Sequence, residues 1–274
     1  MSKKTLRLAA VAAMGALVLS ACGDGGSGGD SGDSLKIGIK FDQPGLGLKD
    51  GNDYTGMDVE VAKKIAEGLG VDADNIEWVQ APSPQREQLL KTGQVDMIVA
   101  TYSITDARKE EVSFAGPYFV AGQSLLVGAD SDITGLDDSL EGKLVCSVAG
   151  STSAQQIEEA VPGVELQEYN TYSECATQVA NGTLDVLTTD DTILAGYAAQ
   201  EAYQGKLKLA GDTFSTENYG IGLPKDSDRC EEINEIITEM WEDGSMEEII
   251  SDTLGPANYE YNQEQNPPTA DGNC

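Results

Sequence analysis

Apolar and polar positions follow one another at regular periods from residue 35 onward. In LKIGIK the apolar side chains alternate, which is typical of a β-strand with one buried face. In YTGMDVEVAKKIAEGLG they recur every three or four positions, as in a helix that ends at Gly70. The run VDMIVA is apolar throughout, as expected of a buried parallel strand. Together these periods predict strands at 35–40, 75–80 and 95–100, and helices at 54–70 and 83–93, the second with Ser83 as N-cap.

The same order of strands and helices returns between residues 143 and 210. It predicts strands at 143–150, 164–169 and 184–189, and helices at 153–160 and 172–182. The repeat is closest where GQVDMIVAT, ending at Thr101, matches GTLDVLTTD, ending at Asp190. Asp96 and Asp185 begin the two matched strands, and we interpret both as structural. Thr101 and Asp190 lie at the carboxyl edges of two parallel sheets, where open α/β folds bind ligands.

This repeat predicts an α/β protein with two lobes of related plan. The strand in ENYGIGL and the helices across 227–253 can return to the first lobe, so the chain crosses between lobes twice. We expect these crossings near Gly122–Leu126 and Glu217–Gly220. The tail is rich in Pro, Asn and Gln and is expected to be loosely ordered. The predicted division is a first lobe of 35–122 and 220–256, a second lobe of 123–219, and a polar tail of 257–274.

The first 21 residues have the pattern of a secretory signal. Three basic residues precede an apolar stretch at 8–19, which is too short to span a bilayer. The stretch ends in LSAC, and small residues before Cys22 resemble a bacterial lipobox, whose cysteine is acylated (palmitate is one such acyl chain) and becomes the new N-terminus. A plain signal peptide with a chance cysteine is the alternative. Residues 22–34, rich in Gly and Ser, then form a flexible tether that holds an exported domain at the outer face of the cytoplasmic membrane.

Composition removes several classes of function. The chain has 47 acidic and 17 basic residues, a net charge of -30, so a nucleic-acid partner is not expected. It has no histidine, which removes the commonest metal ligand, and we expect no metal and no cofactor.

The cysteines that follow Cys22 indicate disulfides. They are four in number and form no CxxC pair, and an even count in an exported protein predicts two bridges. Three pairings are possible. We favour Cys146 with Cys175, within one lobe, and Cys230 with Cys274, which ties down the tail.

Several polar residues follow predicted strands and suit an amino acid as ligand. In TYSITDAR, Thr101 and Ser103 offer hydroxyls, and Arg108 offers a two-pronged donor for a carboxylate. The alternative is that Thr105 caps a short helix and Arg108 is a surface charge. Lys40 is conspicuous at the mouth of an apolar strand in so acidic a chain.

The second lobe offers the complementary groups. GSTSAQQ begins a helix, whose free amides and the hydroxyls of Ser151 and Thr152 suit an anion. A simple N-cap is the alternative, and both can hold. Asp190 would accept the ammonium of an amino acid, with Asp191 as the competing assignment. The internal repeat favours Asp190 because it places this residue opposite Thr101.

Over residues 35–254 the chain resembles the family 3 extracellular solute-binding proteins that feed polar amino acids to ABC importers. The resemblance rests on GMDVEVAKKIAEGLG, GQVDMIVATYSITDAR, AGPYF, VAGSTSAQ, LDVLTTD and DGSMEEII. KFDQPGLG, SPQRE, ATYSI, CSVAGST and YGIGL look like the lipid-anchored glutamate-binding proteins of actinobacteria. The resemblance implies a periplasmic-binding-protein-like fold of type II that closes on a hinge. It also implies a permease partner and a monomeric binding protein that is not an enzyme.

The resemblance also implies roles for residues of the site. Relatives place a residue that reads the ligand side chain at Lys40, an aromatic cover at Gln43 and a side-chain contact at Arg86. The matching serine and arginine, Ser103 and Arg108, bind the ligand, and Thr152 contacts its α-carboxylate.

The charges expected in this site favour an acidic ligand. Lys40, Arg86 and Arg108 against Asp190 give the expected site a charge of +2, which favours L-glutamate because a neutral ligand leaves buried cations unpaired. Aspartate, glutamine and asparagine stay open, as do a dehydratase-like enzyme and a sensor on the same fold.

Overall fold

The computed structural model describes residues 34–270 and Cys274. The predicted signal, the acylated Cys22 and almost all of the tether lie outside these residues. Within the described part, no helix is both long and apolar enough to cross a membrane.

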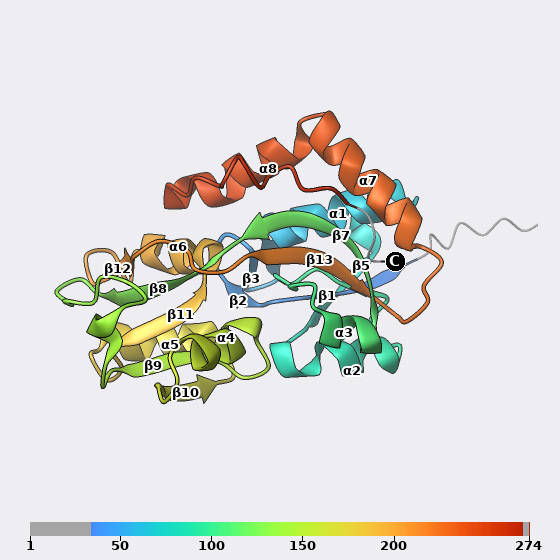
Figure 1. Cartoon of the computed structure of the whole chain (residues 1–274). Coiled ribbons are helices and arrows are strands. Elements are labelled where there is room, and N and C mark those ends of the chain that lie inside the picture. The colour runs from blue at the N-terminus through green and yellow to red at the C-terminus, as the bar shows by residue number, and fades with distance from the viewer. Residues whose placement is uncertain (1–33, 271–273) are drawn as a thin grey trace, which may run out of the picture. The chain divides into compact units, whose positions relative to one another are not determined.

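The first of two five-stranded sheets contains strands from both ends of the described chain (Figure 1). Strand β1 pairs in parallel with β5 and β6, whereas β13 runs antiparallel to β6 and β7. We call this sheet and the elements packed on it the first lobe. Its strands, in spatial order, are β5 (Ile76–Gln80), β1 (Leu35–Ile39), β6 (Met97–Ile98), β13 (Glu217–Leu223) and β7 (Ser113–Ala121). Its helices are α1 (Met57–Gly68), α2 (Arg86–Lys91), α3 (Asp106–Glu111), α7 (Cys230–Glu242) and α8 (Ser245–Leu254).

A small antiparallel sheet follows β1 and packs on α1. It consists of β2 (Asp42–Gln43), β3 (Gly47–Asp50) and β4 (Asp53–Thr55). The turn between β2 and β3 is tied to the start of α1, because the amide of Met57 donates to the carbonyl of Gly45 at 2.9 Å. This turn therefore belongs to the first lobe.

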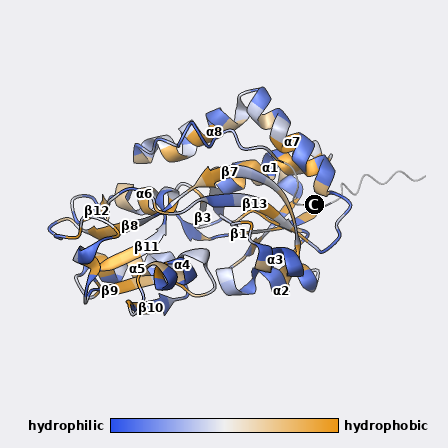
Figure 2. Cartoon of the chain, in the orientation of Figure 1, coloured by the Kyte–Doolittle hydropathy of each residue, from blue (hydrophilic) through white to orange (hydrophobic). Residues whose placement is uncertain are grey.

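The second sheet is built from the middle of the chain, and we call it and its helices the second lobe. Its strands, in spatial order, are β10 (Glu165–Tyr169), β9 (Leu144–Val148), β11 (Val186–Asp190), β8 (Gln123–Gly128) and β12 (Leu207–Ala210). Its helices are α4 (Thr152–Ala160), α5 (Tyr172–Ala180) and α6 (Asp191–Ala199). Figure 2 shows hydrophobic residues along the inner strands of both lobes, with polar residues on the outward turns of the helices.

The internal repeat is confirmed in its backbone. In the first lobe the Asp96 carboxylate accepts from the Lys36 amide at 2.7 Å, and the Asp96 amide donates to the Lys36 carbonyl at 2.8 Å. In the second lobe Asp185 makes the same pair of bonds with Leu144, at 2.9 and 3.0 Å. Each aspartate thus ties the entry of one strand to the start of its parallel neighbour, which is the structural role predicted from the sequence.

Some predicted elements differ from those observed. The apolar run at 95–100 contributes only the two residues of β6 to the sheet, and the chain then turns at Thr101, whose φ is 43°. Ser83 does not cap a helix. It begins a 3-10 turn after Pro82, and its hydroxyl accepts from the Lys40 ammonium at 2.7 Å.

The crossings between the sheets are short. The first occurs at Gly122, between β7 and β8, within the predicted range. The second comes earlier than predicted, because β13 already pairs with β7 at Glu217. Residues 217–219 therefore lie in the first sheet, in contrast to the predicted boundary at 219/220.

The tail is packed where the structure describes it, contrary to the expectation of loose order. The side chain of Asn266 accepts from the Val120 amide at 2.9 Å and donates to the Val120 carbonyl at 3.0 Å. Tyr261 packs its ring against Phe119 and Trp241. The indole of Trp241 in turn donates to the Tyr118 carbonyl at 3.1 Å. The expectation of loose order was based on polar composition, which does not reveal specific contacts with β7.

Both favoured disulfides are present. Cys146 on β9 is bonded to Cys175 on α5, and Cys230 at the start of α7 is bonded to Cys274 in the tail. The first bridge lies within the second lobe, and the second holds the tail on the first lobe.

Candidate functional site

Three basic side chains of the first lobe converge on one aromatic ring and its surroundings. The guanidinium of Arg86 lies 4.1 Å from the centre of the Tyr102 ring, and that of Arg108 lies 4.9 Å from the same centre. Lys40, which follows β1, is near enough that both guanidinium charges act on it. Lys40 and Arg86 are 5% and 2% exposed, so both cations lie in the interior.

The surroundings of Lys40 disfavour its charged form. Its ammonium donates to the Ser83 hydroxyl at 2.7 Å, and within the described residues it forms no ion pair. Burial, followed by the charge of Arg86, lowers the pKa of Lys40 to about 7, with partial compensation from the carboxylate of Asp42. An acidic partner would restore the charged form.

Arg86 and Gln43 carry buried donors with no partner among the residues that the structure describes. One Nη of Arg86 donates to the Ala100 carbonyl at 3.1 Å, but its Nε is unpaired, as is the Nε2 of Gln43. Burial, and then the charge of Arg108, lowers the pKa of Arg86 to about 10. Buried N–H groups are normally satisfied, so these two donors are available to an acceptor that is not part of the chain.

Thr101 stands where β6 leaves the sheet and is held in a strained conformation. Its φ of 43° is rare for a β-branched residue. Its amide donates to the Asp58 carboxylate at 3.0 Å, and Tyr118 donates its hydroxyl to the other oxygen of Asp58 at 2.6 Å. Burial raises the pKa of Asp58 to about 6. Asp58 was not predicted as a site residue, although a carboxylate among the apolar positions of GMDVEVA is a signal in the sequence.

Ser103 and Thr152 come from different lobes and meet at a carboxylate that was not predicted. Their hydroxyls lie 3.4 Å apart, and both donate to Glu217, at 2.5 and 3.0 Å. The other oxygen of Glu217 accepts from Gln156 and Ser215, each at 2.8 Å. Because each hydroxyl has one proton, these two groups are donors to Glu217 and not free donors for a ligand carboxylate. The signal that could have found Glu217 is its place at the predicted crossing.

Arg108 is half-buried and bridges the two lobes. One Nη donates to the Ser103 carbonyl at 2.6 Å, and the other donates to the Gly150 carbonyl of the second lobe at 3.2 Å. Its side chain is 10% exposed and forms an ion pair with Glu87 at 3.6 Å. Thr105 does cap α3, by accepting from the Arg108 amide. The cap is therefore present, but the accompanying idea of a surface charge is wrong.

On the second lobe, Ser151 is the N-cap of α4 and accepts from the Ala154 amide at 3.0 Å. The hydroxyl is used within the helix. The amides of Thr152 and Ser153, which precede Ala154 in the first turn, have no carbonyl partner inside an α-helix and lie at the positive end of its dipole, so the position still suits an anion.

The two neighbouring aspartates have different surroundings. Asp190 ends β11, is 3% exposed, and accepts from Tyr219 at 2.6 Å and from Ser153 at 3.3 Å. Burial, and then the charge of Glu217, raises the pKa of Asp190 to about 8. Asp191 instead accepts from the Gly122 amide at 3.3 Å and from Tyr259 of the tail at 3.1 Å. Asp190 is therefore the carboxylate grouped with the other candidate residues, and Asp191 faces the crossing and the tail.

The charge count made from the sequence was incomplete. It omitted Asp58, Glu217 and Glu87, all of which contact predicted site residues. The region therefore has no simple net charge of +2. It has a cationic side around Tyr102 in the first lobe and an anionic side at Asp190 and Glu217, which suits a zwitterion with an extra carboxylate.

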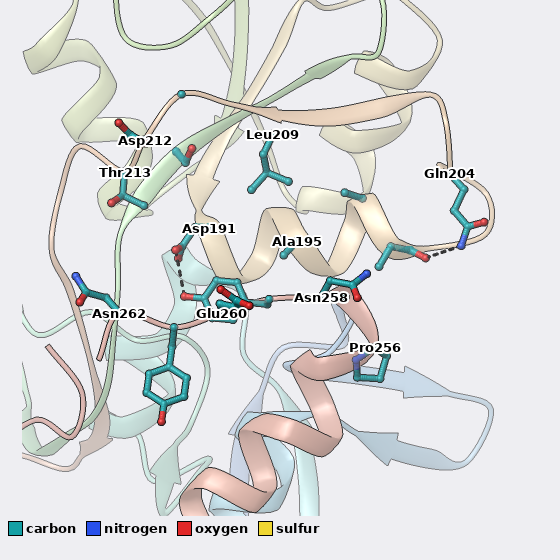
Figure 3. A pocket seen from close by; sticks show the side chains of 17 residues that line it. Asp191, Ala195, Gln204, Leu209, Asp212, Thr213, Pro256, Asn258, Glu260 and Asn262 are labelled. Carbon is teal, nitrogen blue, oxygen red and sulfur yellow. Dashed lines mark hydrogen bonds between the residues drawn. The ribbon is translucent and has the colours of Figure 1, made fainter. Parts of the chain in front are cut away.

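A large hollow lies elsewhere in the described structure. It has a volume of about 760 Å³ and lies between α6 and the tail, where Tyr259 reaches Asp191 (Figure 3). Carboxylates, amides and small apolar side chains line it, and none of the predicted site residues does. The region between Lys40 and Tyr172 keeps a cavity of only about 10 Å³, because the lobes are in contact there. We therefore place the candidate site by its buried charges and not by cavity size.

A two-lobed α/β fold of this topology, with charged groups at the strand ends of both lobes, defines a binding protein of the periplasmic type II class. The chain belongs to the bacterial extracellular solute-binding proteins, family 3, whose family model matches residues 35–255. It is similar to the glutamate-binding protein GluB of Corynebacterium glutamicum, at 44% identity over 89% of this chain and 88% of that protein. It is also similar to the ABC transporter glutamine-binding protein GlnH of Bacillus subtilis, at 36% identity over 90% of this chain and 96% of that protein.

Solved structures agree on the fold. An ancestral arginine-binding protein bound to glutamine matches with a TM-score of 0.73 and 34% identity, covering 81% of this chain and 98% of that chain. The ancestral amino-acid-binding protein AncCDT-1, a precursor of cyclohexadienyl dehydratase, matches with a TM-score of 0.71 and 27% identity, covering 81% of this chain and 95% of that chain.

Proposed function

We propose that this protein binds L-glutamate between its lobes and delivers it to the permease of an ABC importer. The observation that carries the proposal is the pair of buried cations, Lys40 and Arg86, neither of which forms an ion pair among the described residues. A buried charge without a partner is costly, and the side-chain carboxylate of glutamate would supply one. The likeness to GluB, which is named as a glutamate-binding protein, supports this choice.

The amino-acid part of the ligand would be held by groups from both lobes. Asp190 would accept the ammonium, which stabilises its ionised form. Arg108 and the first amides of α4, at Thr152, would bind the α-carboxylate. Ser103 and the hydroxyls of Ser151 and Thr152 would act by positioning, since Glu217 and the helix cap already use them. Gln43 and Thr101, which are hydrogen-bonded at 3.3 Å, would line the side-chain end of the site.

Binding would be coupled to lobe closure, because only the closed arrangement presents groups from both sides to one ligand. We further propose that acylated Cys22 anchors the monomer at the outer face of the cytoplasmic membrane, where the closed form meets its permease. Failure of a lipid probe to label Cys22 in cells would rule out the anchor.

Glutamine is the second candidate ligand, for a specific reason. The carboxylates of Asp58 and Glu87 lie within the cationic side of the site and reduce the excess of positive charge that a ligand must balance. GlnH, named as a glutamine-binding protein, is also similar to this chain. No observation favours an enzyme or a sensor, since the curated relatives reported above are named as binding proteins.

Titration calorimetry of the purified domain against the twenty amino acids tests the proposal. We expect glutamate to bind most tightly, with aspartate weaker, because the shorter side chain moves one carboxylate away from Lys40 and Arg86. One methylene is worth roughly 1–3 kcal/mol in such pockets. Glutamine binding more tightly than glutamate would overturn the acidic ligand and leave the transport class intact. Conversion of a ligand into a product would instead indicate an enzyme.

A further inference from the structure

Gly196 stands inside helix α6, where glycine is unfavourable. Glycine in a helix costs roughly 1 kcal/mol relative to alanine, so its presence in DTILAGYAA needs a reason. A Cβ built on Gly196 would lie 2.1 Å from the carbonyl oxygen of Pro44, a distance that no side chain can occupy. The next nearest atoms, at 3.1 and 3.6 Å, also belong to Pro44. Outside the helix's own backbone and the adjoining residues, the second lobe therefore places nothing nearer than 3.6 Å, and the crowding comes from the first lobe.

The next residue of α6 holds the same segment of the first lobe. The hydroxyl of Tyr197 donates to the carbonyl of Asp42 and lies 3.2 Å from the Asp42 carboxylate. That carboxylate also accepts from the Ser173 amide in the first turn of α5, at 3.3 Å. Tyr197 is 1% exposed, so loss of this contact would leave a buried hydroxyl without its acceptor, which is costly.

The segment 42–45 is braced from behind by its own lobe. Gly45, with a φ of 80°, sits against the end of α8, where an added Cβ would lie 3.0 Å from Leu254 and 3.1 Å from the Thr253 carbonyl. The turn closes through a bond from the Leu46 amide to the Gln43 carbonyl at 3.1 Å. It therefore presents a fixed surface to α6, and β2 is in contact with both α5 and α6 (Figure 1).

We propose that Gly196, Tyr197 and the turn at 42–45 form a closure clasp, a contact between the lobes that is separate from the ligand contacts and sets how readily the lobes close. Gly196 lets α6 approach the Pro44 carbonyl, and Tyr197 then fastens the two lobes. This proposal rests on the proposed function, in which the ligand binds most tightly to the closed form. It contributes the same free energy whichever amino acid is bound, so it sets affinity and not selectivity.

The test compares Gly196→Ala and Tyr197→Phe with Gly128→Ala. Gly128, at the end of β8, has no atom within 4 Å of an added Cβ and no positive φ, so it serves as the matched control on the second lobe. In Gly196→Ala the added methyl group overlaps the Pro44 carbonyl, so α6 has to move away from the first lobe. This should weaken glutamate and glutamine binding alike by roughly 10- to 100-fold, the range of overpacking costs. Loss of the Tyr197 hydrogen bond should weaken both by roughly threefold to tenfold. Gly128→Ala should leave both affinities unchanged.

A direct measurement of the lobe separation completes the test. Spin labels at Glu67 and Gln155, both exposed, would report the distance between α1 and α4. Gly196→Ala should remove the short-distance population and keep the cooperative unfolding of the wild type, since alanine suits the helix. Unchanged affinities or identical distance distributions would overturn the clasp. If the wild type binds no amino acid, the proposed function fails, and the clasp is then judged on the ligand-free distance distributions alone, where identity of wild type and variant again refutes it.

Discussion

The two matched segments, 93–101 and 182–190, begin alike and end differently. At their entries, Asp96 and Asp185 make the same two hydrogen bonds to the start of a neighbouring strand. At their ends, Thr101 turns into a left-handed conformation held by Asp58, whereas Asp190 remains in the strand and becomes the N-cap residue of α6. The aspartates at the start of the two segments hold neighbouring strands together. The residues at the end, Thr101 and Asp190, differ in charge between the lobes. The sequence repeat therefore predicts the positions of site residues in the fold but not the chemical groups that they carry.

The largest effect should follow from removing the acidic end of this comparison. Asp190→Asn should weaken glutamate and glutamine equally, by roughly 2–5 kcal/mol, since it removes one partner of a buried charge pair with the ligand ammonium. Isothermal titration calorimetry would measure the affinity of the variant for each ligand. Asp191→Asn is the control, because its carboxylate bonds to Gly122 and Tyr259. A greater loss in the control than in Asp190→Asn would reverse the assignment of the two residues.

On the cationic side, the effect should depend on the ligand. Lys40→Met keeps the length of the side chain and should cost glutamate roughly 2–5 kcal/mol, whereas glutamine should lose little, because it makes no charge pair there. Competition binding of the two ligands gives the ratio directly. Lys49→Met, on an exposed lysine of β3, is the matched control. Equal losses for both ligands would count against a side-chain role for Lys40.

The two ends should also respond oppositely to pH. The raised pKa of Asp190, about 8, means that a proton must leave as the ammonium binds, so affinity for any amino acid falls as pH drops through 8. The lowered pKa of Lys40, about 7, means that affinity for glutamate alone falls as pH rises through 7. The preference for glutamate over glutamine should therefore drop roughly tenfold between pH 6 and 8, at one decade per unit beyond the pKa. A preference that rises with pH contradicts this.

The smallest effect concerns the matched entries. Asp96→Ala and Asp185→Ala should each reduce the free energy of unfolding by about 1 kcal/mol, the usual value of such a hydrogen bond, with no change in ligand affinity. Urea unfolding of each variant beside a calorimetric titration separates the two outcomes. A loss of affinity in either variant would mean that the entries are part of the site and not only of the framework.

Much of the fold could be predicted because periodic apolar positions report burial, and burial fixes strands and helices. The strand at 35–40, the helix at 172–182 and the crossing at Gly122 were all close to what the structure has. Asn266 shows where such prediction stops. Its two bonds to Val120 order the tail, but a single buried amide leaves no period in the sequence.

The candidate site was predicted in part for the same reason. Lys40, Arg108 and Asp190 stand out as charges that follow apolar strands, whereas Arg86 was expected from the family resemblance alone. The structure does bring the three cations together. Glu217 and Asp58 were missed, because the donors that tie each of them to predicted site residues lie more than forty positions away. The roles expected of Ser103 and Thr152 as free hydroxyl donors changed once Glu217 was located. A single sequence does not show which residues form hydrogen bonds with residues far away in the chain.

The bond from the indole of Trp241 to the Tyr118 carbonyl has a practical consequence. Tyr118 lies on the strand that leads to Gly122, and its hydroxyl reaches Asp58 beside Thr101. A native fluorophore is thus hydrogen-bonded to the strand that leads to the first crossing, where the proposed lobe closure would change the backbone. Its emission should shift on titration with an amino acid, which would provide a label-free optical readout in which Trp241→Phe abolishes the signal.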